Sequence, residues 1–170
     1  MRLHIVTTGG TIDKVYFDAQ SAFEVGEPQI LEILRHAGTT LEVSHETAMR
    51  KDSLEMTDAD REAVARRVAA ADARHVVVTH GTDTMAETAR AIARHLGDAP
   101  DRTVVLVGSL TPARFKTTDA EFNVGFAVAA AQTLPPGVYV AMNGRVFNPF
   151  RVRKNRAANR FEDSDAAQDT

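Results

Sequence analysis

The stretch Leu3–Ile12, LHIVTTGGTI, joins an apolar, β-branched run directly to a loop of threonine and glycine. The stretch His75–Thr84, HVVVTHGTDT, repeats this arrangement in the middle of the chain. Short β-branched runs predict buried strands, so each polar loop lies beyond the carboxyl end of a strand. Ligands bind at that edge of an open α/β sheet. The two loops therefore predict one site that presents hydroxyl groups to a small polar ligand.

Further short apolar runs alternate with segments of helical periodicity. We expect additional strands at 41–45, 103–107 and 138–142, and helices at 28–37, 57–72, 84–96 and 118–133. Pro28 is favourable near a helix start, the Thr57–Asp60 segment resembles a capping sequence, and Gly97 is typical of a helix end. The alternation predicts an α/β fold of three layers, a mostly parallel, doubly wound sheet with helices on both faces.

A single domain is expected over residues 1–160, because a chain of 170 residues is long enough for one sizeable core. Near the end, a basic segment that contains Lys154 gives way to acidic side chains. That change in charge predicts a mobile tail over residues 161–170.

Composition excludes several kinds of chemistry. The chain has no cysteine, which excludes disulfides, thiolate catalysis and cysteine-based metal sites. Its net charge of -3 gives no reason to expect a nucleic-acid partner. The first residues lack a signal-peptide pattern, and the longest apolar stretch, 122–134, is too short to span a membrane. We therefore expect a soluble cytoplasmic protein with no membrane partner.

Thr11 is the first candidate for chemistry. Its hydroxyl follows two glycines at a strand end, so a substrate can approach it closely, and nearby N–H groups can stabilise an oxyanion. A hydroxyl needs a base or a proton relay to act as a nucleophile, and Tyr16 is near enough in sequence to be that partner. The alternative is that Thr8 and Thr11 only satisfy backbone groups at a tight turn.

The second loop offers Thr82 as another hydroxyl and Asp83 as a carboxylate for a substrate ammonium. Alternatively, Asp83 and Thr84 cap the helix that follows. No metal-ligand spacing accompanies His80, so a structural, hydrogen-bonded histidine is expected, and no metal or cofactor is expected. Lys154 is either a solvated lysine in its basic segment or a proton acceptor beside Thr82.

Taken together, these loops resemble the bacterial-type (type I/II) L-asparaginase family. The family's two fingerprints, Thr-Gly-Gly-Thr-Ile and His-Gly-Thr-Asp-Thr-Met, stand here without a gap at 8–12 and 80–85. Further matches are Val107-Gly108-Ser109, Asp119 with Phe122-Asn123, Met142-Asn143, Lys154, and Ser53 within Asp52–Met56. The resemblance covers essentially the whole chain, and the two threonine motifs together are highly specific.

The resemblance implies the roles of particular residues. Thr11 would be the nucleophile that attacks the side-chain amide of L-asparagine, giving an acyl-enzyme and ammonia. Thr82, Asp83 and Lys154 would form a second set, in which the lysine lowers the proton affinity of the hydroxyl. The residues implied to bind substrate are Gly10, Asp52, Ser53, Gly81 and Asp83. Ser53 would hold the α-carboxylate, and Asp83 would meet the α-amino group.

The chain departs from the family pattern in three places. The tyrosine that partners the first threonine is replaced in its usual register by Phe23, and we favour Tyr16 because phenylalanine cannot relay a proton. Leu54 stands where the family has a glutamine, which predicts a millimolar KM for asparagine and poorer turnover of glutamine. The family is about twice as long, so the resemblance implies a short, single-domain form without the C-terminal domain.

Two other functions remain open at the level of sequence. One is the ammonia-releasing, asparaginase-like subunit of a tRNA-dependent amidotransferase, which would need further domains and a basic surface. The other is a non-catalytic amino-acid-binding module. We also expect a homodimer built partly on segment 122–134, whose small residues suit close helix contacts. They are Gly125, Ala127, Ala129, Ala130 and Ala131.

Overall fold

A six-stranded sheet forms the centre of the molecule. A computed structural model describes residues 1–17 and 22–164 of the chain. The strands lie in the spatial order β4-β1-β5-β6-β7-β8. They are β1 (Arg2–Gly9), β4 (Glu42–Lys51), β5 (His75–Thr79), β6 (Thr103–Val107), β7 (Gly137–Met142) and β8 (Arg145–Phe147). All neighbours pair in parallel except β8, which pairs antiparallel with β7.

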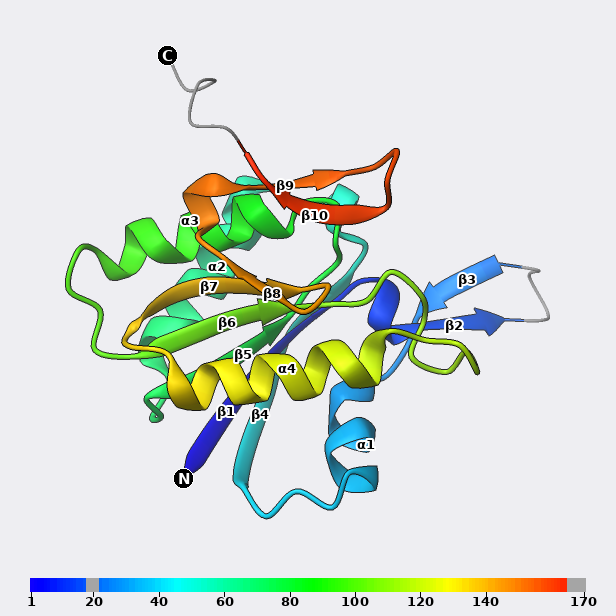
Figure 1. The fold of residues 1–170 in the computed structure, drawn as a ribbon, viewed down its shortest axis with the longest axis horizontal. Helices are drawn as coiled ribbons and strands as arrows, with labels where there is room; N and C mark the ends of the chain where they lie inside the picture. The colour runs from blue at the N-terminus through cyan, green and yellow to red at the C-terminus, as the bar shows by residue number, and fades with distance from the viewer. Residues whose placement is uncertain (18–21, 165–170) are drawn as a thin grey trace.

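Helices cover both faces of this sheet. They are α1 (Gln29–His36), α2 (Asp58–Ala70), α3 (Met85–Leu96) and α4 (Ala120–Thr133). Helices α2 and α3 pack together on one face, and α1 and α4 lie on the other (Figure 1). This arrangement confirms the expected three-layer, mostly parallel α/β fold. No helix among residues 1–17 and 22–164 is long and apolar enough to cross a membrane.

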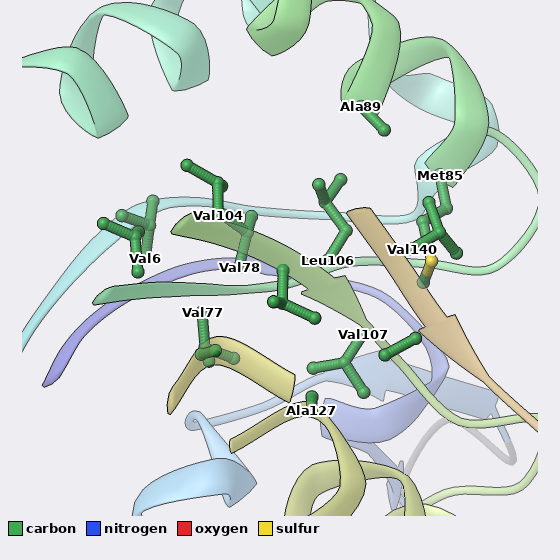
Figure 2. Packing of buried hydrophobic residues seen from close by; sticks show 14 of the residues in the cluster. Val6, Val77, Val78, Met85, Ala89, Val104, Leu106, Val107, Ala127 and Val140 are labelled. Atoms are coloured by element: carbon green, nitrogen blue, oxygen red, sulfur yellow. The ribbon is translucent and has the colours of Figure 1, made fainter. Parts of the chain in front are cut away.

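The central strands are apolar throughout because both of their faces are covered. In β5 and β6 every valine and leucine side chain is fully buried. Figure 2 shows Val104 and Leu106 on the side of the sheet that faces α3, and Val107 on the side that faces Ala127 of α4. Alternate residues of one strand thus fill two different cores, which explains why these runs show no polar alternation.

The helix ends follow the signals in the sequence. The Thr57 hydroxyl accepts from the Asp60 N–H at 3.2 Å, and the Asp60 carboxylate accepts from the Thr57 N–H at 2.9 Å. This reciprocal pair is a capping box at the start of α2. Pro28 stands directly before α1, and Gly97, with φ of 73°, follows the last residue of α3.

The small residues of α4 are divided between two environments. Ala127, Ala130 and Ala131 are buried within the chain. They let α4 approach its own sheet closely and are not available to a second copy, contrary to expectation. Gly125 and Ala129 lie on the exposed side of the helix.

The segment after β8 is ordered beyond the point where a tail was expected to begin. Strands β9 (Val152–Asn155) and β10 (Arg160–Asp163) form an antiparallel hairpin. Phe161 is buried, and its ring centroid lies 6.4 Å from that of Phe147. The expectation of a mobile segment from Phe161 is wrong for residues 161–163. The charged residues around Phe161 indicated a solvated segment, but the Phe161 ring is buried and fixes the strand. Residues 165–170 lie outside the described part of the chain.

A second hairpin follows the first strand. The short 3-10 helix η1 (Thr11–Asp13) leads into β2 (Lys14–Phe17) and β3 (Ala22–Val25). Asp13 is buried at the base of this hairpin, where its carboxylate accepts from the Gln29 N–H at 2.8 Å. Asp13 therefore joins the hairpin to the first residue of α1.

Burial raises the pKa of Asp13 to about 6, although the hydrogen bond from Gln29 acts in the opposite direction. Between about pH 4 and pH 6 the folded chain therefore holds a proton that the unfolded chain has released, so Asp13 destabilises the fold increasingly as pH rises through this window. We expect Asp13→Asn, which stays neutral, to be more stable relative to wild type at pH 7.5 than at pH 4.5, by about 2 kcal/mol. Urea unfolding of both proteins at the two pH values measures this difference. A difference that does not change with pH would contradict it.

Candidate functional site

The two threonine loops touch through a pair of glycines. Strands β1 and β5 are neighbours in the sheet, with Thr7 opposite Thr79. Gly10 has φ of 92°, and a methyl group built on it would lie 2.4 Å from the Cα of Gly81. Only glycine fits such a contact, because φ is in the left-handed region and the neighbour is backbone. The contact places Thr11 and Thr82, each one residue further on, at the same edge of the sheet.

The threonines of the first loop have different roles. The Thr8 hydroxyl is buried and donates to the Thr79 carbonyl at 2.9 Å. Thr8 therefore satisfies a backbone group, as one alternative from the sequence held. Thr11 instead begins η1 and is only half-buried. The half-buried position leaves Thr11 open to an approaching ligand.

Lys154 binds the second loop. Its ammonium donates to the Thr82 hydroxyl at 2.7 Å and to the Asp83 carboxylate at 3.1 Å. Thr82 is buried, and the Lys154 side chain is 14 % exposed. Of the two alternatives for Lys154, its position beside Thr82 is confirmed, and the fully solvated lysine is wrong. Strand β10 supports this position, because Phe161 lies opposite Lys154 in the hairpin.

Ser53 lies against the same loop from the other side. It begins the short 3-10 helix η3 (Ser53–Glu55) and is 1 % exposed. A methyl group on Gly81 would lie 2.6 Å from the Ser53 Oγ. The Thr84 hydroxyl donates to the Ser53 carbonyl at 2.8 Å and makes no capping hydrogen bond to α3. The alternative in which the Thr84 hydroxyl caps the helix is therefore wrong, since that hydroxyl joins the second threonine loop to the Ser53 segment instead.

Asp52 is held by an ion pair that the sequence did not suggest. The Lys14 ammonium donates to Asp52 at 2.7 Å, which connects strand β2 to the Ser53 segment. Partial burial opposes ionisation, but the hydrogen bonds from Lys14 and from the Leu54 N–H, with the charges of Lys14 and Lys154, keep the pKa of Asp52 below its ordinary value. Asp52 is therefore a carboxylate at neutral pH.

Tyr16 and Phe23, the two candidates for the position of the partner tyrosine, face each other across the β2–β3 hairpin. Their rings meet edge to face with centroids 5.5 Å apart, and both are about half exposed. Phe115 adds a third ring, 6.0 Å from Phe23. Within residues 1–17 and 22–164, the Tyr16 hydroxyl makes no hydrogen bond to Thr11. The structure thus places Tyr16 on the hairpin beside the loop without joining its hydroxyl to Thr11.

His80 is structural, as expected. It is fully buried, and its Nδ1–H donates to the Gly81 carbonyl at 2.7 Å. Because Nδ1 carries the proton, Nε2 accepts from the Thr88 hydroxyl at 2.7 Å. Burial lowers the pKa of His80 to about 4, so the ring is neutral at physiological pH. It therefore fixes the loop between β5 and α3 without adding charge.

Two charged neighbours of the site were missed at the level of sequence. They are Lys14, which pairs with Asp52, and Arg156, whose Nε lies 3.4 Å from Asp83. Arg156 had a usable signal only in its closeness to Lys154, since it stands two residues later at the start of the turn that follows β9. Lys14 had none, since its partner lies in a distant segment.

The pattern of these loops matches a known family. The model of the asparaginase N-terminal domain matches residues 2–165. The chain belongs to the asparaginase family. An L-asparaginase from Thermococcus kodakarensis is 32 % identical over 161 residues, which cover 91 % of this chain and 48 % of that protein. The chain therefore spans about half the length of this relative.

A solved structure and a further relative are also similar to this chain. The solved structure of the thermostable L-asparaginase from Thermococcus kodakarensis has a TM-score of 0.82 at 28 % identity, over 96 % of this chain and 51 % of that one. A subunit of the glutamyl-tRNA(Gln) amidotransferase from Pyrobaculum aerophilum is 34 % identical over 139 residues, 79 % of this chain and 33 % of that protein. The fold of this chain is thus that of the N-terminal asparaginase domain.

The contact between Gly10 and Gly81 can be tested by adding a methyl group. We expect Gly10→Ala to destabilise the fold by about 2–4 kcal/mol, since it combines an unfavourable positive φ with a backbone clash. Gly125→Ala is the matched control, because nothing lies within 4 Å of a methyl group at that exposed position of α4. It should stabilise the fold by about 0.5–1 kcal/mol. Urea unfolding measures both, and equal effects would show that the two loops do not depend on this contact.

Proposed function

We propose that this chain hydrolyses the side-chain amide of L-asparagine to L-aspartate and ammonia through a threonine nucleophile. The observation that carries the proposal is the contact of the Lys154 ammonium with Thr82 at 2.7 Å and with Asp83 at 3.1 Å. Thr82 and Asp83 follow Gly81, which touches Gly10 directly before Thr11, and Lys154 reaches them from β9. A nucleophilic hydroxyl and a proton-handling group thus meet at one edge of the sheet.

The reaction proceeds in two steps. The Thr11 oxygen bonds to the carbon of the amide, the C–N bond breaks, and the hydroxyl proton leaves with the nitrogen as ammonia. Water then cleaves the resulting ester, releases aspartate and restores the Thr11 hydroxyl. Thr82, supported by Lys154, helps to carry the proton, and Tyr16 is the proposed partner of Thr11 once the hairpin brings its hydroxyl close.

Substrate binding uses the groups around Gly10 and Gly81. Ser53, held against Gly81, bonds the α-carboxylate, and Asp83 pairs with the α-ammonium. Leu54 is 62 % exposed and offers no polar group for a further hydrogen bond. The loss of such a bond weakens binding by about ten- to a hundredfold, so we propose a KM for asparagine in the millimolar range, with glutamine the poorer substrate.

A second candidate function uses the same chemistry to supply ammonia to a tRNA amidotransferase. The similarity to the glutamyl-tRNA(Gln) amidotransferase protein favours it. The net charge of -3 does not, because binding to tRNA calls for a basic surface. Ammonia release from free asparagine without tRNA supports the first function. A non-catalytic binding module would bind asparagine and release none.

We expect Thr11→Ala to lose several orders of magnitude in the rate of ammonia release from asparagine, because only binding and oxyanion contacts remain. Lys154→Met should also remove most of the turnover, because the Thr82 hydroxyl loses its hydrogen bond from the Lys154 ammonium. Thr40→Ala and Lys116→Met, at exposed positions, are the matched controls and should keep wild-type rates. A Thr11→Ala protein with more than about a tenth of wild-type turnover, a loss of only about 1.4 kcal/mol, would rule out Thr11 as nucleophile.

We also propose a homodimer that uses the exposed side of α4. Phe122 is 62 % exposed and stacks on Phe126, next to the exposed Gly125 and Ala129. An apolar surface of aromatic and small residues suits a close helix contact between two copies. Light scattering at micromolar concentration should report a dimer, and Phe122→Asp should shift it to a monomer. A monomeric wild type would refute the dimer.

A further inference from the structure

The carboxylate of Asp83 has two cations on one oxygen. Lys154 Nζ lies 3.1 Å from Asp83 Oδ1, and Arg156 Nε lies 3.4 Å from the same atom. The hydrogen bond that Asp83 accepts from Lys154 also ends on Oδ1. The three side chains together therefore carry a charge of about +1, although Asp83 alone would offer −1 to a ligand cation.

The two cations differ in what they do for the site. The Lys154 side chain is 14 % exposed and also binds the Thr82 hydroxyl, so it belongs to the reacting groups. The Arg156 side chain is 68 % exposed, and Asp83 is its ion-pair partner in the described part of the chain. Removal of Arg156 therefore leaves the Thr82–Lys154 contact in place.

The turn between β9 and β10 keeps Arg156 beside Asp83. Its backbone is closed by a hydrogen bond from the Asn159 N–H to the Arg156 carbonyl at 3.3 Å, and Asn159 itself has φ of 47°. The Asn155 side chain accepts from the Ala158 N–H at 3.0 Å. Figure 1 shows this turn at the free end of the hairpin that covers the start of α3. Asp83 and Arg156 border the same cavity of about 200 Å³ between α3 and the hairpin.

We infer that Arg156 competes with the substrate's α-ammonium for Asp83 and so sets how strongly this site selects amides that carry an α-amino group. The inference rests on the proposed function, in which Asp83 receives the ammonium. An ammonium that approaches the Asp83 carboxylate is repelled by Arg156, and it gains the full attraction of Asp83 only when the guanidinium moves away. A substrate without the α-amino group makes no ion pair with Asp83, so its binding affinity does not depend on the position of Arg156.

The size of the effect follows from the exposure of the pair. Ion pairs between solvent-exposed side chains are weak, and this one is partly screened by water. Removal of Arg156 should therefore improve the binding of an α-ammonium by about two- to fivefold. Turnover at saturation should change less than twofold, because Arg156 does not contact Thr11 or Thr82.

The test compares two amides that differ only in the α-amino group. L-asparagine has it, and succinamate (4-amino-4-oxobutanoate) lacks it. Arg156→Ala should lower the KM for L-asparagine by two- to fivefold and leave the KM for succinamate unchanged. Arg153→Ala is the matched control, since its side chain is 64 % exposed on the same hairpin and pairs with Glu162 instead of Asp83. It should change neither KM.

Binding of the product and its analogue separates this inference from the proposed function. Calorimetric titration with L-aspartate and with succinate needs no turnover. Suppose that wild type releases no ammonia but that Arg156→Ala binds L-aspartate more tightly and succinate no more tightly. The proposed function then fails, while the inference that Arg156 competes with an α-ammonium for Asp83 holds. Weaker L-aspartate binding in Arg156→Ala would show that Arg156 holds the carboxylate and would overturn the inference. Equal changes for both ligands, or no change, would overturn it as well.

Discussion

The rest of the site depends on the close approach of two backbones at Gly10 and Gly81. Strands β1 and β5 are hydrogen-bonded neighbours, so the loops that follow them leave the sheet side by side. The space between these loops is smaller than a methyl group requires. Side chains at either position would separate Thr11 from Thr82 and displace Ser53, which packs against Gly81. The absence of two side chains is thus what lets the segments that carry Thr11, Thr82 and Ser53 meet.

The charged part of the site depends on an apolar anchor far along the chain. Lys154 reaches Thr82 from β9, a strand outside the main sheet. Strand β10 pairs with β9 and is fixed by the buried ring of Phe161. The backbone N–H of Phe161 also donates to the Asn143 side chain at 3.0 Å. Asn143 is in the tight turn between β7 and β8, where its φ of 54° suits an asparagine. The position of one ammonium therefore rests on hydrophobic burial and a turn.

The charge of each ionisable group near the two loops depends on its surroundings. His80 is neutral because it is buried between Gly81 and Thr88, and Asp52 is ionised because Lys14 donates to it. Asp83 faces two cations, so the carboxylate proposed to receive a substrate ammonium is already neutralised by the chain. Selectivity at such a site depends on competition between charges rather than on shape alone.

The amino-acid sequence by itself determined the layers of this fold and the two loops. β-branched runs such as Val76–Val78 favour buried strands, helix signals such as Thr57 and Gly97 are local, and a Gly-Gly turn after a strand has few conformations. The sequence also led to Lys154, through the resemblance to a family. Only the tertiary structure decided that Phe161 is buried instead of part of a tail, and that the Thr84 hydroxyl bonds Ser53 instead of capping a helix. It also decided that Lys14 pairs with Asp52 and Arg156 with Asp83. Most of those contacts join segments far apart in the chain, and the burial of the Phe161 ring depends on the elements packed around it. A local sequence pattern predicts neither long-range contacts nor burial of this kind.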